Sequence, residues 1–315
     1  LAEIERGSIE RDLGRRDFTV NAIALSLPKG EPLDPFGGIA DLARRRLRAV
    51  LAKNFEEDPL RALRAARFLA THGLRADAHT ERVCRRAAPG LSDVAPERIR
   101  AELARLLEAV RAAPALSWAA RARLLGPALG LPLPEPARRK LARSGAAFDS
   151  AAIRGLPPDG RRRARLALLS GALGLKAPET SRWLCARRWS RQDAGSVARL
   201  RALAQASGDA RTADGQWRWI RDAGGSAREA LALIAALTPS GAAVAGRLSR
   251  RLAAARPVPG VRGSDVIAWL KLAPGPAIGK LLCEIEIAGL SGRVRSRRQA
   301  RKWLEDNAPA IIQSS

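Results

Sequence analysis

The chain has 315 residues, with 56 Lys and Arg against 31 Asp and Glu, and its formal net charge of +25 is spread along its whole length. This arginine-rich excess favours a polyanionic partner, and nucleic acid rather than a membrane, because no apolar run reaches the ~18 residues of a spanning helix and no signal-peptide pattern opens the chain. Three widely separated cysteines indicate neither a disulfide framework nor a zinc site, so we expect a protein of the reducing cytoplasm without a membrane anchor.

The first fifty residues predict a small mixed α/β unit. Two arginines and an aspartate at 15–17 precede an apolar, β-leaning run at 18–27, which ends at a Pro-Lys-Gly turn. A Gly- and Pro-containing turn at 33–38 then leads into a helix at 41–46 and a short strand at 47–50. These elements are too few to form a stable domain by themselves.

A helix is predicted to begin at Pro59, because Asp58-Pro59 has the form of an N-cap followed by proline at the first helical position. From there Arg61, Arg64 and Arg67 recur at every third residue. In one interpretation Asp58 is only a cap and the arginines form a solvated face. In the other, Asp58 accepts a hydrogen bond from the exocyclic amine of a base and Arg61 donates to the neighbouring ring nitrogen. The second arrangement admits cytosine and adenine and refuses uracil and guanine, which carry a carbonyl in place of the amine.

The chain from Phe55 onward predicts successive amphipathic helices and no further strand. One helix begins at Pro96, where apolar residues follow at helical spacing. Further helices are expected at 115–125, 161–174, 178–187, 190–206, 214–223 and 226–237, separated by proline-rich breaks at 131–136, 157–160 and 256–260.

Other candidate residues have simpler interpretations beside the functional ones. His72 and His79 lack the Cys or acidic partners of a metal site, and four tryptophans among arginines suit either helix packing or stacking on RNA bases. Charge runs in the second half are either solvated faces or phosphate contacts, and a proline–glycine turn at 274–279 offers free N–H groups to a phosphate. The RNA-binding candidates from these segments are Arg161, Arg162, Arg163, Lys280, Arg297 and Arg298.

The order of these motifs resembles one known family, the class II tRNA nucleotidyltransferases, which comprise the CCA-adding enzymes and the bacterial poly(A) polymerases. Residues 15–22 (RRDFTVNA) resemble the family's nucleotide-sugar motif, and residues 34–38 (DPFGG) with Asp41-Leu42 resemble its flexible head–neck motif. Residues 57–61 (EDPLR) with Arg64 resemble its amino-acid template for the incoming base. The resemblance is strongest over residues 10–110, and the segments 263–267 and 274–282 also look like the family's tail.

The resemblance implies a mostly α fold with a small α/β remnant at the N-terminus: a partial polymerase-β-like nucleotidyltransferase head followed by helical neck, body and tail. The implied domains are the C-terminal part of the head at 1–52, a neck for base recognition at 53–112, an RNA-binding body at 113–256 and a tRNA-binding tail at 257–315.

The resemblance also implies functional roles. Arg16 would contact a nucleotide phosphate, Asp17 the ribose 2′-hydroxyl, and Asn21 would help to place the triphosphate. The implied substrates are CTP and ATP, and the implied partner is the acceptor arm of tRNA. The implied nucleotide-binding set is Arg16, Asp17, Asn21, Asp58, Arg61, Arg64 and Arg67.

The family's metal-binding aspartates form an Asp-x-Asp pair upstream of the Arg15 motif, and no such pair occurs in these 315 residues. The resemblance therefore implies Mg²⁺ in the complete enzyme, with its ligands outside this sequence. Together with the complete lack of Met, this predicts an N-terminally truncated chain that has no catalytic residue of its own and is inactive alone. Addition of C and/or A to tRNA is the favoured function, with a poly(A) polymerase and a non-catalytic RNA-binding remnant as alternatives. The sequence carries no indication of the oligomeric state.

Overall fold

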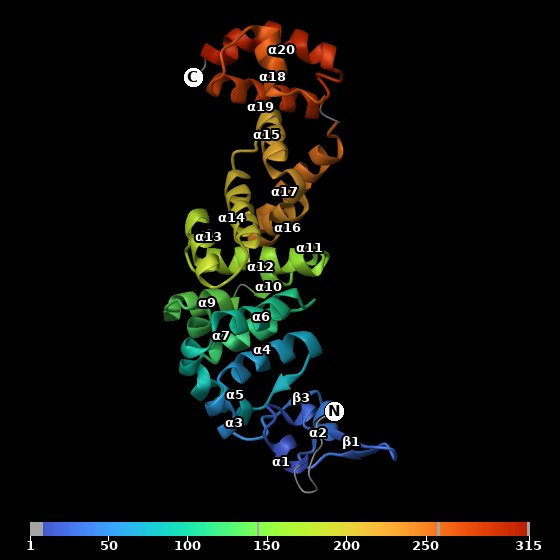
Figure 1. Ribbon diagram of the computed structural model, residues 1–315, viewed down its shortest axis with the longest axis vertical. Coiled ribbons are helices and arrows are strands. Elements are labelled where there is room, and N and C mark those ends of the chain that lie inside the picture. The colour runs from blue at the N-terminus through green and yellow to red at the C-terminus, as the bar shows by residue number, and fades with distance from the viewer. Residues whose placement is uncertain (1–8, 144, 257–258, 314–315) are drawn as a thin grey trace. The chain divides into compact units, whose positions relative to one another are not determined.

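The computed structural model describes residues 9–143, 145–256 and 259–313, and most of them are helical (Figure 1). The prediction of a mostly α fold with a small α/β N-terminal part is confirmed. The chain divides after Arg201 into two compact units. The finer division into head, neck, body and tail stays a prediction.

The N-terminal segment contains short elements only. They are α1 (Ile9–Gly14), the 3₁₀ helix η1 (Thr19–Asn21), β1 (Ala24–Ser26), β2 (Glu31–Leu33) and α2 (Gly38–Ala43). β1 and β2 pair antiparallel, with Ala24 opposite Leu33 and Ser26 opposite Glu31. The apolar run predicted as β-leaning at 18–27 therefore forms a strand only in its second half, because residues 19–21 close into a 3₁₀ turn.

A second, parallel pair joins β3 (Arg46–Leu47) to β4 (Arg75–Ala76). The prediction that no strand follows residue 55 is therefore wrong. The chain returns because the preceding helix ends at Gly73, which has a φ of +63° that glycine adopts without strain. A strand of two residues leaves no alternation in the sequence by which it could be recognised.

Helix α4 (Leu60–His72) lies at the centre of the first unit, in contact with α6 and α7. Its buried face consists of Leu60, Ala62, Leu63, Ala65 and Ala66. Since three of these are alanines, the neighbouring helices approach closely. The surrounding elements are α3 (Lys53–Glu57), α5 (Ala78–Ala87), η2 (Ala88–Asp93), α6 (Pro96–Glu108), α7 (Ala113–Arg121) and α8 (Leu125–Leu129). Helix α6 begins at Pro96 as predicted.

Three short helices that were not predicted follow, α9 (Glu135–Arg143), α10 (Gly145–Phe148) and α11 (Ala151–Arg154). The next three agree with predicted helices to within a few residues: α12 (Pro158–Ala172), α13 (Ala177–Ala186) and α14 (Arg191–Ala206), within which the first unit ends. Arg165 of α12 is fully buried and donates to the carbonyl oxygens of Leu107, Ala109, Val110 and Phe148. It also pairs with Asp149 at 2.8 Å, so one arginine closes the end of α6 against α10 and α12.

In its described residues the second unit consists of helices joined by loops, without a strand (Figure 1). Its elements are α15 (Ala213–Ala223), η3 (Gly224–Ser226), α16 (Ala227–Leu237), α17 (Pro239–Ala253), α18 (Gly263–Leu270), α19 (Pro276–Leu290) and α20 (Arg297–Gln313). Val266, Leu281, Ile285 and Leu304 are at the centre of the core that joins the last three helices. The predicted helices at 214–223 and 226–237 are confirmed, whereas α17, α18 and α20 were not predicted.

The tryptophans left open between packing and RNA stacking are packing residues in this fold. Trp183, Trp189, Trp217 and Trp219 are all buried. The indole N–H of Trp183 donates to the carbonyl of Leu129 at 3.0 Å, and that of Trp219 donates to another backbone carbonyl at 2.9 Å. Their faces are thus covered by protein.

Candidate nucleotide-binding site

A hollow of about 480 Å³ gathers the residues of the predicted nucleotide-binding set. Its lining comes from the segment after α1, the start of α4 and the start of α6. All of the set except Arg67 line it. The lining residues are Arg15, Arg16, Asp17, Asn21, Asp58, Leu60, Arg61, Arg64 and Arg98.

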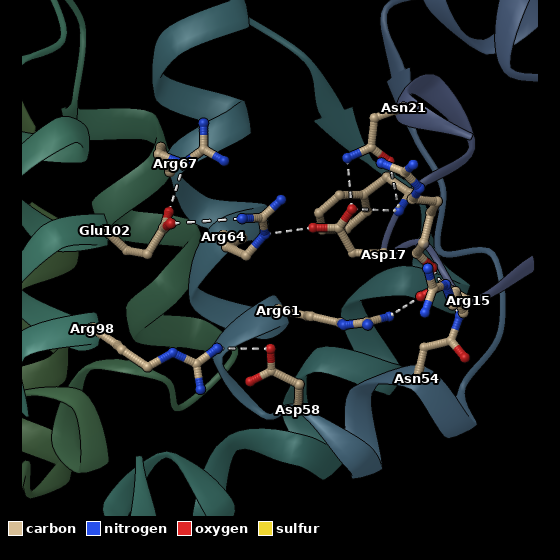
Figure 2. Close-up of polar contacts among 12 residues, drawn as sticks. Arg15, Asp17, Asn21, Asn54, Asp58, Arg61, Arg64, Arg67, Arg98 and Glu102 are labelled. Carbon is tan, nitrogen blue, oxygen red and sulfur yellow. Dashed lines mark hydrogen bonds and ion pairs between the residues drawn. The ribbon is translucent and has the colours of Figure 1, made fainter. Parts of the chain in front are cut away.

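Asp17 is the buried anchor of the hollow, with 4% of its surface exposed. Its Oδ1 accepts hydrogen bonds from the backbone N–H of Phe18 at 3.0 Å and from Nδ2 of Asn21 at 2.6 Å, and its Oδ2 accepts from Nε of Arg64 at 2.5 Å (Figure 2). The ring of Phe18 packs edge-on against the ring of Phe55, with 5.7 Å between centroids, and this contact holds the turn in place. Because a carboxylate offers about four acceptor positions, the three hydrogen bonds leave Asp17 able to accept one more.

Glu102 of α6 connects the two arginines that follow along α4. It accepts a hydrogen bond from Nε of Arg67 at 2.5 Å and lies 3.8 Å from Nη1 of Arg64 (Figure 2). Burial acts to lower the pKa of Arg64, but the charges of Asp17 and Glu102 outweigh it and hold that pKa above its usual value. Arg67 lies over the ring of Phe68 at 4.4 Å and outside the hollow lining. It supports the packing of α4 on α6.

The carboxylate of Asp58 does not cap α4. Asp58 ends α3 in an extended conformation, α4 begins at Leu60 after Pro59, and no side chain makes a cap hydrogen bond there. The prediction that the Asp58 side chain caps this helix is therefore wrong, because the backbone carbonyl of Asp58, and not its carboxylate, accepts from the N–H of Arg61. Pro59 has helical φ and ψ, so the predicted helix start agrees with the structure to within one residue. The Asp58 carboxylate instead accepts from Nη2 of Arg98 at 3.0 Å (Figure 2).

Arg61 and Asn54 hold the segment that carries the exposed arginines. Arg61 donates to the carbonyl oxygen of Arg15 at 2.6 Å, and Nδ2 of Asn54 donates to the carbonyls of Gly14 and Arg16, both at 2.8 Å (Figure 2). The guanidinium groups of Arg15 and Arg16 remain at the surface, and their hydrogen bonds to Asp12 keep the pKa of that carboxyl below its usual value. Each guanidinium carries five N–H donors, so donors remain for an anion.

The structure adds residues that no sequence pattern singled out. Arg98 and Glu102 are four residues apart on α6, which places them on one face. Arg98 lines the hollow, and the buried Glu102 pairs with the α4 arginines. The sequence feature that could have identified them is a pair of opposite charges four residues apart in the helix that follows the Asp58 motif. No sequence feature pointed to Asn54.

The turn at 34–41 joins this site to the strands. The carboxylate of Asp34 accepts from the N–H groups of Gly38 at 2.6 Å and Ile39 at 2.9 Å. Any residue other than glycine is excluded at position 38, because its Cβ would lie 2.1 Å from the carbonyl oxygen of Thr19. Asp41 has a fully buried carboxylate that accepts from Thr19 at 2.7 Å and also pairs with two arginines of the 46–48 segment.

Comparisons with known proteins bear on this arrangement. Residues 2–48 match a family model described as the poly A polymerase head domain, and residues 73–132 match one described as the probable RNA and SrmB-binding site of polymerase A. A CC-adding tRNA nucleotidyltransferase of Synechocystis is 45% identical over 111 residues, which is 35% of this chain and 27% of that protein. The chain's match thus spans about a quarter of the length of that curated relative.

The crystal structure of the Bacillus stearothermophilus CCA-adding enzyme in complex with CTP has a TM-score of 0.75 and 30% identity, covering 98% of this chain and 76% of that one. The chain belongs to the CCA-adding enzyme family. The Thermotoga maritima CCA-adding enzyme complexed with tRNA is similar in fold, with a TM-score of 0.69 at 21% identity, covering 95% of this chain and 74% of that one.

The arginines predicted to bind RNA in the first unit of this family member are half-buried and engaged within the protein. Arg161 donates to the carbonyl oxygens of Glu108, Arg154 and Leu156. Arg162 pairs with the side chains of Glu108 and Asp193, and Arg163 pairs with Asp159 at 2.7 Å. RNA contact by these three stays a prediction, and it would compete with bonds that hold α12 in place.

The candidates of the second unit lie at its surface. Lys280 of α19 and Arg298 of α20 are exposed. Arg297 pairs with Asp265, and its guanidinium lies 5.7 Å from the centroid of the Trp269 ring. RNA contact by these residues also stays a prediction.

No group of three or more His, Cys, Asp or Glu side chains is placed to hold a metal ion in the described ranges. His72 lies against the ring of Phe68, with 5.2 Å between centroids. The carboxylates of Asp17 and Asp41 are bonded to arginines, so these residues do not fit the paired-carboxylate site that two Mg²⁺ ions require. None of the helices in the described ranges has the length and apolar character needed to cross a bilayer.

Proposed function

We propose that this chain selects the incoming nucleotide for a reaction that adds C and/or A to the 3′ end of tRNA, with CTP and ATP as substrates. The observation that carries the proposal is that Asp58 and Arg61 line the same hollow as Asp17 and Arg16. The Asp58 carboxylate makes no cap hydrogen bond to α4. The names of the relatives, which are CC-adding and CCA-adding enzymes, support the same substrates.

Base selection follows from the chemistry of the two side chains. Oδ1 of Asp58 accepts from the exocyclic amine of cytosine or adenine, and Arg61 donates to the adjacent ring nitrogen. Arg98 bonds only Oδ2 of Asp58, which orients the carboxylate and leaves the other oxygen for the base. Uracil and guanine place a carbonyl oxygen against that carboxylate and are refused, because two acceptors share no proton.

Ribose and phosphate selection use the opposite side of the hollow. The remaining acceptor position of Asp17 suits the 2′-hydroxyl, which a deoxynucleotide lacks. The surface guanidiniums of Arg15 and Arg16 suit the triphosphate. Asn21 holds the Asp17 carboxylate in this orientation through its 2.6 Å hydrogen bond.

Mg²⁺ is proposed to serve the complete reaction through ligands that these 315 residues do not contain, since they lack an Asp-x-Asp pair. We therefore propose that this chain alone binds nucleotide without transferring it. The cytoplasm is the proposed location, where tRNA is available.

A poly(A) polymerase of the same family is the second candidate, favoured by the descriptions of both matching family models. Such a chain would bind ATP and refuse CTP. A non-catalytic RNA-binding protein would show no selectivity among nucleotides.

Equilibrium binding of CTP, ATP, UTP and GTP to the 315-residue chain tests the proposal. CTP and ATP should each bind about tenfold or more tighter than UTP and GTP, since one charge-assisted hydrogen bond is worth roughly 1.5–3 kcal/mol. Selective binding of ATP alone would assign the chain to the poly(A) polymerases, and equal binding of all four would contradict base selection.

A transfer assay tests the assignment of the metal ligands. The pure chain is incubated with Mg²⁺, CTP, ATP and a tRNA that lacks its terminal CCA. No nucleotide should be incorporated. Incorporation above that of a heat-denatured control would show that the chain contains the metal ligands after all.

A further inference from the structure

Three arginines of the second unit cluster on one face of α17. Arg247, Arg250 and Arg251 are spaced at i, i+3 and i+4, which brings their side chains together on the helix surface. With Gln216 and Ala254 they line a hollow of about 320 Å³.

These arginines differ from others of the same unit in their lack of acidic partners. Arg218 pairs with Glu284 at 2.7 Å, and Arg301 pairs with Glu305 at 2.8 Å. Across the described part of the chain, no ion pair joins Arg247, Arg250 or Arg251 to a carboxylate. Three adjacent positive charges without a counter-charge raise the local potential and attract an anion.

Arg251 is held in position by the protein itself. Its Nε donates to Oε1 of Gln216 at 2.9 Å, and the Gln216 side chain is in turn largely buried, with 8% of the residue exposed. The Arg251 guanidinium also lies 5.0 Å from the centroid of the Trp217 ring. These contacts fix one guanidinium beside the hollow while its two Nη groups remain as donors.

We propose that this hollow binds a backbone phosphate of the RNA substrate. A phosphodiester offers two non-bridging oxygens, and the planar guanidinium fork matches them in two-point hydrogen bonds. A membrane headgroup fits less well, because none of the large exposed apolar side chains of the described residues belongs to α15 or α17, and a membrane-bound helix buries such a face. That the phosphate belongs to RNA rests on the proposed function.

A phosphate contact positions the RNA without reading its sequence. The site would therefore act on any RNA of suitable shape and would leave base selection to the hollow in the first unit. It would also make binding depend on salt, because each neutralised phosphate releases counterions.

The test compares two double variants of the full chain. Arg247→Gln with Arg250→Gln removes two of the three charges and leaves Arg251 bonded to Gln216. The matched control, Arg218→Gln with Arg301→Gln, removes the same charge from arginines of this unit that already have glutamate partners. A third variant, Arg247→Lys with Arg250→Lys, keeps the charge without the planar fork.

The readout is the dissociation constant for a tRNA that lacks its CCA end, measured from about 50 to 200 mM salt. The first variant should bind about tenfold weaker, and its slope of log affinity against log salt should fall by about 1. The control should change less than about twofold. The Lys variant should keep the parent slope with intermediate affinity. An RNA hairpin of unrelated sequence should lose affinity by the same factor.

Equal losses for the first variant and the control would overturn the phosphate site. So would loss of binding to vesicles containing phosphatidylserine with no loss of RNA binding. CTP and UTP binding, measured on the same preparations, reports on the first unit. If CTP selectivity holds while the variants bind RNA alike, only this inference fails; if the parent lacks CTP selectivity, the proposed function fails by itself. Unchanged thermal midpoints for these exposed substitutions would confirm that all variants are folded.

Discussion

The carboxylate of Asp58 accepts a hydrogen bond from Arg98 at 3.0 Å, although Asp58 directly precedes the Pro59–α4 corner where a capping aspartate is expected. The two residues come from the end of α3 and from α6. Glu102, one turn further along α6, holds Arg64 and Arg67 of α4. The position of the proposed base-reading carboxylate is thus set by the packing of α4 on α6 and not by a local turn.

Replacing Arg165 with Met should destabilise the protein by on the order of 3–5 kcal/mol, because Asp149 and several backbone carbonyls would lose their only common donor. Burial lowers the pKa of Arg165 to about 10, so the group remains charged at neutral pH. Denaturant unfolding measures the effect. Arg139→Met, at an exposed arginine paired with Glu135, is the control and should cost no more than about 1 kcal/mol. A similar small cost at both positions would contradict a role for Arg165 in closing α6 against α12.

Asp41 should make stability depend on pH. Burial acts to raise the pKa of Asp41, but hydrogen bonds from Thr19, Arg46 and Arg48 outweigh it and leave that pKa below its usual value. A folded pKa below the unfolded value of about 3.9 means that the stabilisation is fully present above the unfolded pKa and is lost as the pH falls through the folded one.

The measurement is the free energy of unfolding of the parent and of Asp41→Asn between pH 7 and pH 3. The parent should be more stable at pH 7, and its advantage should shrink as the pH falls below about 4. An advantage that stays constant or grows toward low pH would show that the Asp41 carboxylate is not stabilised by these donors.

Asp17→Asn should weaken the preference for ribonucleotides. The amide loses the charge that holds Arg64 and has fewer acceptor positions for the 2′-hydroxyl. The ratio of CTP to dCTP affinity should fall toward one, and unfolding should cost about 1–3 kcal/mol less, since a buried charged partner is removed. Asp12→Asn, an acid outside the hollow lining, is the control and should leave the ratio unchanged. An unaltered ratio in Asp17→Asn would rule out the ribose contact.

The sequence predicted which residues would meet but not how they are held. The motifs at 15–22 and 57–64 converge on one hollow. This could be predicted, because the spacing and order of the two motifs resemble those of a known family. Arg98 and Glu102 escaped notice because their partners are 35 or more positions away in the chain, and only the packing of α6 on α4 brings them together.

Predictions from local sequence failed where the hydrogen-bond partner lies far away in the chain. The cap rule misplaced the Asp58 side chain, because its carboxylate accepts from Arg98 of α6 and makes no cap hydrogen bond at the start of α4. β4 was missed because its pairing depends on distant residues: the N–H of Arg75 donates to the carbonyl of Arg45, and the N–H of Asp77, just after β4, donates to that of Leu47. The amphipathic helices were predictable, since the spacing of their apolar residues shows which face is buried.

Asp58→Asn gives the most direct test of the proposed base selection, through the dissociation constants of CTP, ATP, UTP and GTP for the parent and the variant. Because Asp58 caps no helix and its bond to Arg98 is partly exposed, stability should change by less than about 1 kcal/mol. CTP and ATP should bind about tenfold or more weaker, and UTP and GTP should not, since the amide can turn its N–H₂ toward their carbonyl. If all four constants stay as in the parent, Asp58 does not read the base.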